Sequence, residues 1–197
     1  MAHKLKISLD NTEPLVSRTV IVPEDFSFDD LHLVIQCVMN WENEHMYQFN
    51  TGTAYQGDTI GIPDPEHYTE FFKRRNKSYD STETYLSEYF NGQKKKLTYV
   101  YDFGDDWIHT ITRLTKPKEE VEQPKCIAGE NVAPRENCGG LWGFYDLIEM
   151  SKKKRKSAEE KEHLEFYGIN KGSTYEDVYG FDIEKVNEKL EYVFSDE

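Results

Sequence analysis

The sequence is poor in cysteine, in long apolar runs and in positive charge, and each shortage excludes a class of protein. Its three cysteines, Cys37, Cys126 and Cys138, form an odd and sparse set, which favours a reduced, cytoplasmic protein. No stretch approaches the roughly 18 consecutive apolar residues of a membrane span. The first residues run into an alternating strand pattern and resemble no signal peptide. We therefore expect no association with a membrane.

Positive charge is scarce, because 24 Lys and Arg residues stand against 37 Asp and Glu residues, for a net charge of −13. Non-specific binding to nucleic acid draws its free energy from neutralising phosphates, so this balance argues against such an interface. Three local basic runs remain, at residues 73–75, 94–96 and 152–156. The favoured interpretation is that each is a solvated face or loop. The alternative is that they converge into one polyanion patch, which spacing along the sequence does not decide.

Complete catalytic and cofactor motifs are also missing. The sequence has no Walker loop, no GxSxG, no HExxH and no dinucleotide-binding fingerprint. Zinc sites usually show two short-spaced ligand pairs, whereas Cys126 and Cys138 lie far apart without a CxxC. We therefore expect no cofactor, and these two cysteines are the candidate ligands should a divalent metal bind.

Aromatic residues are abundant, and they make up for a modest apolar content. Apolar residues are 37% of the chain and aromatic residues 14%, and each aromatic side chain buries a large area. A chain of 197 residues suits one domain with a substantial core. We expect residues 1–197 to form a single domain.

Hydrophobic periodicity and turn residues predict the order of the elements. Leu5, Ile7 and Leu9 alternate with polar residues as in a half-buried strand, and Ser27 is placed to cap a helix that starts at Phe28. The predicted strands are 4–9, 18–22, 46–50, a part of 53–60, 97–103 and 107–114. The predicted helices are 28–41, a short one from Asp80–Ser81 to Tyr89, 141–150, one capped by Ser157 and one starting near Asp182, and 61–77 is predicted as a loop. Strands first and helices late indicate an α+β fold, with an N-terminal β-hairpin plus helix, a central antiparallel sheet and C-terminal helices packed on it.

The central hairpin, residues 101–111, carries the densest group of acids, aromatics and histidine. Gly104 and Asp105 between two aromatic-rich strands predict a two-residue turn. In that register Asp102 lies opposite Trp107, and His109 is the diagonal neighbour of Asp102 on the same face.

Two interpretations of this hairpin compete. In the structural one, Asp102 and Asp105 hold the turn backbone, and His109 is a satisfied partner beside a packed Trp107. In the functional one, Asp102, Asp106 and His109 form a metal site or a general base. A turn rich in aspartate is common, so the structural interpretation is favoured.

The downstream segment 129–140 is the second dense stretch. Glu130, Glu136 and Cys138 could supply oxygen and sulfur ligands beside the hairpin, and the twin glycines Gly139 and Gly140 suit a tight backbone passage into the next helix. Upstream, His45 could join His109 at one cleft, although the favoured interpretation places it after a helix end.

These residues resemble the plasmid pRiA4b ORF-3-like family along nearly the whole chain. The matching positions are Arg18, Leu31, His32, Ile35, Gln36, Trp41, His45, Phe49, Tyr101–Asp105, Trp107, His109, Cys126, Gly129, Glu130, Pro134, Glu136, Cys138–Gly140, Gly143, Phe144, Phe181, Asp182 and Asn187. The chain departs from the family pattern at residues 14–17, where Pro-Leu-Val-Ser stands in place of Pro-Pro-Ile-Trp, and at three further positions. Ala133 stands where the family usually has a cysteine, Arg135 where it has a proline and Asn137 where it has an aspartate.

The resemblance implies a compact α+β domain of largely uncharacterised activity that is linked to plasmids and insertion elements. It supplies no established catalytic residues. We therefore expect a non-enzymatic binding or accessory domain that contacts a protein or small-molecule partner through a cleft around the hairpin. The candidate binding residues are Trp107, His45, Glu130, Glu136, Arg18 and Tyr101. The alternative is a metal-dependent hydrolase or nuclease-like enzyme that uses Asp102, Asp106 and His109.

Overall fold

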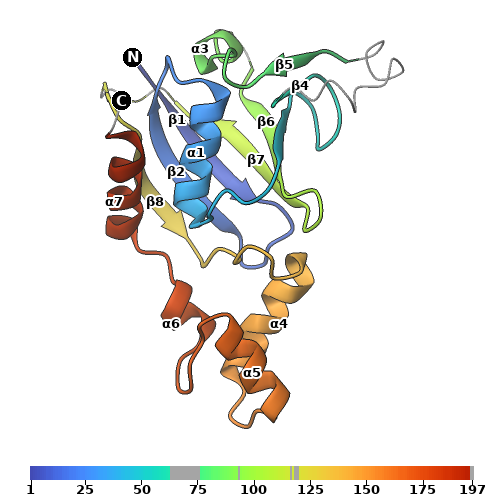
Figure 1. Ribbon diagram of the computed structural model, residues 1–197. Coiled ribbons are helices and arrows are strands. Elements are labelled where there is room, and N and C mark those ends of the chain that lie inside the picture. Colours follow the sequence, from blue (N-terminus) through green and yellow to red (C-terminus); the bar gives the residue numbers. More distant parts are fainter. Residues whose placement is uncertain (63–75, 93, 116, 118–119, 196–197) are drawn as a thin grey trace.

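The computed structural model describes residues 1–62, 76–92, 94–115, 117 and 120–195. Within them the strands join into one eight-stranded sheet with the order β5-β4-β3-β6-β7-β1-β2-β8 (Figure 1). All neighbouring strands are antiparallel except β4 and β5, which are parallel. The strands are β1 (Ala2–Leu9), β2 (Val16–Pro23), β3 (Tyr47–Asn50), β4 (Thr59–Gly61), β5 (Ser78–Asp80), β6 (Lys96–Tyr101), β7 (Trp107–Arg113) and β8 (Lys125–Glu130).

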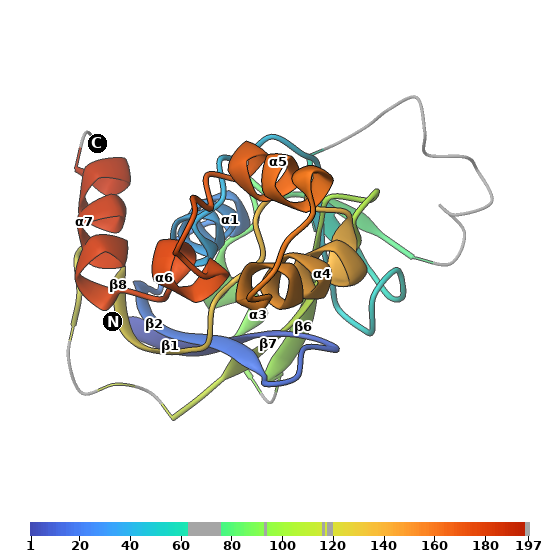
Figure 2. The ribbon, with the colours of Figure 1, turned by 90° about the horizontal axis from the view of Figure 1, so that it is seen from below.

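The helices lie on one side of this sheet or beyond its end, which confirms the predicted α+β class (Figure 2). They are α1 (Phe28–Met39), α3 (Leu86–Tyr89), α4 (Gly140–Lys152), α5 (Ala158–Phe166), α6 (Tyr175–Tyr179) and α7 (Ile183–Phe194). Helix α1 lies over the sheet, and α7 packs against both α1 and the edge strand β8. Helices α4, α5 and α6 form a smaller cluster beyond one end of the sheet.

Helix α1 forms where a capping residue is followed by apolar residues at helical spacing, and its apolar side packs on the sheet. The Ser27 side chain accepts a hydrogen bond from the Asp30 backbone N–H, and the Asp30 side chain accepts one from the Ser27 N–H, so the predicted cap is a full capping box. Leu31 and Ile35 are completely buried and face Leu5 and Ile7 of β1 in one core. The helix ends at Asn40, which adopts the left-handed conformation.

The twin glycines make the tight passage that the sequence predicts. Gly139 has φ 88° and Gly140 has φ 66°, values that side chains rarely allow. A Cβ atom at Gly140 would lie 3.1 Å from the carbonyl oxygen of Asp105, so the backbone passes directly under the hairpin turn. Helix α4 starts at this point.

One side chain of α7, Asn187, hydrogen-bonds to the backbone of the edge strand β8. Asn187 accepts a hydrogen bond from the backbone N–H of Cys126 at 2.8 Å and donates one to the Cys126 carbonyl at 3.0 Å. Its amide therefore occupies the position that a further strand would take.

The predicted register of the central hairpin is wrong by one residue. Tyr101 pairs with Trp107 and Tyr99 pairs with His109, so these four side chains share the inner face. The connection is a loop from Asp102 to Asp106 rather than a two-residue turn. It is closed by a 2.7 Å hydrogen bond from the Asp106 N–H to the Asp102 carbonyl, and both aspartates have positive φ. A slip of one residue moves a strand's side chains to the opposite face, which separates Asp102 from His109.

Two shorter elements also differ from the prediction. Strand β4 covers only Thr59–Gly61, because residues after Asn50 turn back on themselves. Asp80 ends β5 instead of capping a helix, and its carboxylate accepts hydrogen bonds from Thr82. Helix α3 therefore begins only at Leu86. The predicted loop 61–77 lies mostly outside the described residues.

All three cysteines are buried and free. None of the helices in the described ranges is both long enough and apolar enough to span a membrane.

Candidate functional site

The hairpin residues expected to line a cleft are instead part of the core. His109 is 0% exposed and Trp107 is 1% exposed. The His109 Nδ1 lies 3.1 Å from the Trp107 carbonyl, so the ring is protonated at Nδ1 and donates to that oxygen. Burial lowers the pKa of His109 to about 3, which keeps the imidazole neutral at physiological pH. The cleft predicted around Trp107 and His109 is absent from this face of the described sheet.

The three residues of the catalytic alternative do not gather either. The Asp102 carboxylate accepts hydrogen bonds from the backbone N–H groups of Gly104 and Asp105, at 2.9 and 3.3 Å. Asp106 accepts a hydrogen bond from the Tyr55 hydroxyl on the exposed side of the loop. Asp102 therefore has the structural role of holding the turn. In the described residues no group of three or more His, Cys, Asp or Glu side chains is placed to hold a metal ion.

The downstream segment does lie against the hairpin, as the sequence predicts. Tyr101 donates its hydroxyl to the buried Glu136 carboxylate, which also accepts from the Glu42 N–H at 2.5 Å. His45 donates from Nε2 to the Asn137 side-chain oxygen at 2.9 Å, and the same nitrogen lies 3.5 Å from Asp102. His45 thus joins Asp102 rather than His109. These contacts tie three segments together.

Glu130 lies on β8, while Cys138 directly follows the junction residues Glu136 and Asn137. Glu130 accepts a 3.1 Å hydrogen bond from the Ser17 hydroxyl across β2 and β8. Burial raises the pKa of Cys126, and it raises the pKa of Cys138 to about 12, so both side chains are thiols at neutral pH. A thiolate is the form that binds metal, and neither environment stabilises it.

Arg18 is the sequence candidate with the most unusual surroundings. Strand β2 alternates Val16, Arg18 and Val20 on its inner face, and Arg18 lies opposite Ile7 of β1. The side chain is 2% exposed. The guanidinium donates to three backbone carbonyls, those of Val38 at 3.0 Å, Ser17 at 2.8 Å and Glu130 at 2.9 Å. A charged residue thus stands in a row of apolar ones.

The buried charge of Arg18 has no counter-ion in the described part of the chain. Its guanidinium carbon lies 4.2 Å from the centre of the Phe181 ring, and no carboxylate lies within ion-pair distance. Its Nη2 makes no hydrogen bond to a described residue. Burial lowers the pKa of Arg18 to about 10, a value that still leaves the group charged at neutral pH.

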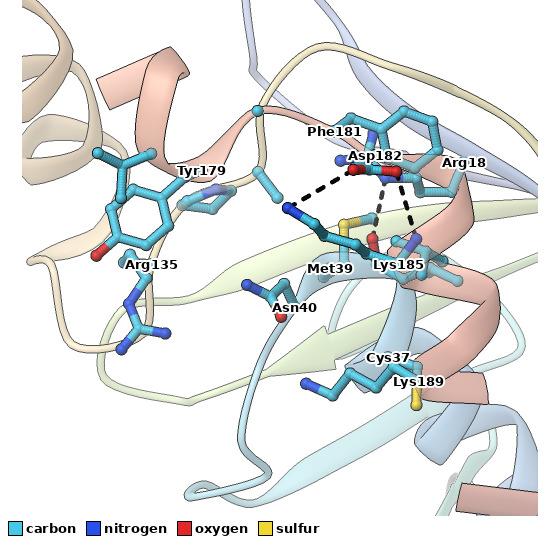
Figure 3. Close-up of a pocket in the computed structure, with 16 residues that line it drawn as sticks. Arg18, Cys37, Met39, Asn40, Arg135, Tyr179, Phe181, Asp182, Lys185 and Lys189 are labelled. Carbon is cyan, nitrogen blue, oxygen red and sulfur yellow. Dashed lines mark hydrogen bonds and ion pairs between the residues drawn. The ribbon is translucent and has the colours of Figure 1, made fainter. Parts of the chain in front are cut away.

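Arg18 lines a pocket of about 130 Å³, which we call the Arg18 pocket (Figure 3). The pocket lies where the end of α1, the loop before α4 and the link from α6 to α7 meet. Three further basic side chains line it: Arg135 from the loop, and Lys185 and Lys189 from α7. Asp182 supplies the acid among the lining residues.

The charges around the pocket are not balanced. Asp182 caps α7 by accepting from the backbone N–H groups of Glu184 and Lys185, and its other oxygen lies 3.7 Å from the Lys185 amine. Lys189 donates to the Trp41 carbonyl at 2.9 Å. The Lys189 amine also lies 3.9 Å from the Glu42 carboxylate, outside the lining, so the two lysines each have an acidic neighbour while Arg18 and Arg135 have no carboxylate within ion-pair distance in the described residues. Such a concentration of positive charge attracts anions.

The sequence named Arg18 as a candidate and Phe181 and Asp182 as family matches, but gave no reason to place them together. Arg135 stood out only as a departure from the family pattern, and the α7 lysines carried no signal. The sequence signal for this pocket was Arg18, an arginine at an inward-facing position of an apolar strand. Of the basic runs, residues 94–96 and 152–156 do not line the pocket, and residues 73–75 lie outside the described ranges.

Fold and site together define an α+β domain with one helical layer and a basic pocket at the sheet edge. The chain belongs to the plasmid pRiA4b ORF-3-like protein family, whose model matches residues 1–189. It is 34% identical over 147 residues to the uncharacterized protein y4hQ of Sinorhizobium fredii, an alignment that covers 74% of this chain and 71% of that protein. It also resembles the crystal structure of MM3350, a protein of unknown function from Methanosarcina mazei Go1. That match has a TM-score of 0.73 and 32% identity, and it covers 93% of this chain and 95% of the other.

Proposed function

We propose that this protein is a non-enzymatic binding domain that holds a small anionic molecule in the Arg18 pocket. The observation that carries the proposal is the buried Arg18 guanidinium, which has three carbonyl partners, no carboxylate and one nitrogen without a hydrogen bond to a described residue. The plasmid named in the description of the family supports an accessory role for a mobile element.

The free energy of burying a charge supports this function. A buried cation without a counter-ion is costly, and backbone carbonyls offset only part of the lost hydration. An anion at the free side of the guanidinium would supply the missing charge through charge-assisted hydrogen bonds. The fold therefore keeps Arg18 ready for an anion, because the three carbonyls hold the planar group in one orientation.

The lining residues favour binding over catalysis. Cys37 is the thiol among them, and burial raises its pKa to about 11, so it is protonated at neutral pH. Asp182 is engaged as the cap of α7. The hydrolase alternative needs Asp102, Asp106 and His109 at one site, and their separation removes its geometric basis.

Thermal unfolding in the presence of anions tests the proposal. Orthophosphate, citrate and acetate would be titrated at constant ionic strength into the wild type, Arg18→Gln and Lys154→Gln. Lys154 is an exposed residue outside the pocket, so its variant loses the same charge without touching the site. A ligand at 100 times its Kd stabilises the fold by about 2.7 kcal/mol, which raises Tm by roughly 5–10 °C.

The expected result is that at least one anion raises Tm in the wild type and in Lys154→Gln and does so far less in Arg18→Gln. Equal shifts in all three proteins would place the anion elsewhere and overturn the proposal. The absence of a shift with every anion would also overturn it. Arg18→Lys, which keeps the charge and loses the planar fork, provides a folded comparison should Arg18→Gln unfold.

A further inference from the structure

We infer that the ligand of the Arg18 pocket is a small organic molecule with two acidic groups, one for each end of the pocket. This inference rests on the proposed function and deepens it. It comes from the placement of two guanidinium groups, Arg18 and Arg135, at opposite sides of the same pocket.

The first end is built from Arg18 and Phe181. The Arg18 guanidinium carbon lies 4.2 Å from the centre of the Phe181 ring, and the ring fits there because Gly129 of β8 has no side chain. A Cβ atom at Gly129 would lie 2.4 Å from the ring. Aromatic ring and carbonyls together fix the guanidinium, so it cannot swing across the pocket to the other end.

The second end is formed by Arg135 and Tyr179. The Arg135 guanidinium carbon lies 5.5 Å from the centre of the Tyr179 ring. Its backbone N–H donates to the Tyr175 hydroxyl at 2.8 Å, which anchors the loop to the helical cluster. As with Arg18, no ion pair joins Arg135 to a carboxylate in the described part of the chain.

Polar groups occupy the space between the two ends. Figure 3 shows Arg18 with Phe181 on one side, Arg135 with Tyr179 on the other, and Asn40 and Lys185 between them. The Arg18 guanidinium is held by backbone carbonyls and the Phe181 ring, and the Arg135 guanidinium lies beside the Tyr179 ring on the other side of the pocket, so a compact anion bound at Arg18 leaves Arg135 without an acidic partner. Two acidic groups on one molecule satisfy both, and the central amide and amine can contact the atoms that join them.

The size of the pocket limits the class of ligand. Its volume of about 130 Å³ is well below the roughly 300 Å³ at which drug-sized sites begin. The pocket suits a small metabolite and not a polymer. Short dicarboxylates are the simplest molecules of this class, and they serve as probes.

Isothermal titration calorimetry with matched acids tests the inference. Succinate and glutarate are the two-ended probes, butyrate is the one-ended probe of similar length, and orthophosphate is the compact anion. The proteins are the wild type, Arg18→Gln, Arg135→Gln and the exposed control Arg155→Gln. Arg135 lies on a half-buried loop, so its variant is expected to fold, which circular dichroism checks.

In the wild type and in Arg155→Gln, a dicarboxylate is expected to bind at least tenfold more tightly than butyrate. In Arg135→Gln this advantage should fall below about twofold while butyrate binding is unchanged. If butyrate or orthophosphate binds as tightly as the dicarboxylates and only Arg18→Gln weakens them, the two-ended ligand is wrong and the anion-binding function stands. If none of the four probes shows binding that depends on Arg18, both are overturned.

Discussion

Substituting alanine for Gly129 directly tests how the Arg18 pocket is built. The new Cβ atom would lie 2.4, 2.6 and 2.7 Å from three carbons of the Phe181 ring, where carbon atoms normally approach to about 3.5–4.0 Å. The ring must therefore move away from Arg18. Gly129 does not have a left-handed φ, so alanine brings no backbone strain and the steric effect stands alone.

The expected cost combines overpacking with the loss of the contact between Phe181 and Arg18. Forcing an extra methyl group into a packed site costs about 1–3 kcal/mol. In a protein of this length each kcal/mol lowers Tm by roughly 2–4 °C. Differential scanning calorimetry and urea denaturation measure both quantities.

Two comparisons make the prediction specific. A Cβ atom at Gly92 would meet no atom within 4 Å, so Gly92→Ala should change stability by less than about 0.5 kcal/mol. In a Phe181→Ala background the obstructing ring is gone, and Gly129→Ala should then cost almost nothing. If Gly129→Ala costs the same in both backgrounds, or no more than Gly92→Ala, the packing of Phe181 between Gly129 and Arg18 is refuted.

Two further predictions concern the core. Tyr101→Phe removes the hydroxyl that binds Glu136, whose side chain is 5% exposed, so unfolding in urea should show a loss of about 1.5–3 kcal/mol. The exposed Tyr192→Phe is the control, and an equal effect of the two would contradict the role of that hydrogen bond. Burial lowers the pKa of His32 to about 4 and that of His109 to about 3, below the unfolded value of about 6.5. The unfolded chain then binds more protons below pH 6.5, so stability should fall by about 2 kcal/mol per histidine between pH 7 and pH 5. His109→Leu should remove about half of this loss, and a pH-independent stability would count against buried neutral histidines.

Periodicity and capping residues were sufficient to predict the elements that depend mainly on nearby residues. Alternation in residues 4–9 and the cap at Ser27 predicted β1 and the start of α1, because one periodicity and one hydrogen-bond pattern specify them. The cap at Ser157 was predicted for the same reason, and the structure completes it as a capping box with Glu160. Short elements such as β4 and α3 depend on their neighbours, and their bounds were missed.

The hairpin register depended on a feature that residue types did not reveal. Gly104 and Asp105 suggested a two-residue turn, but the loop runs from Asp102 to Asp106, and both aspartates adopt positive φ, which aspartate tolerates better than most residues. The hairpin loop is therefore longer than the predicted two-residue turn, and the pairing of β6 with β7 shifts by one position. The pocket was beyond sequence reasoning for another reason: Arg18, Arg135 and Lys185 come from three distant segments and share no spacing.

The side chain of Asn187 limits how far the sheet can grow. An outermost strand with a free peptide group offers a template for another chain, and amyloid-like stacking begins at such templates. In β8 the backbone N–H and the backbone carbonyl of Cys126 are both hydrogen-bonded to the Asn187 side-chain amide on α7. Helix α7 therefore blocks the pairing of another strand at Cys126, in addition to supplying lysines to the pocket.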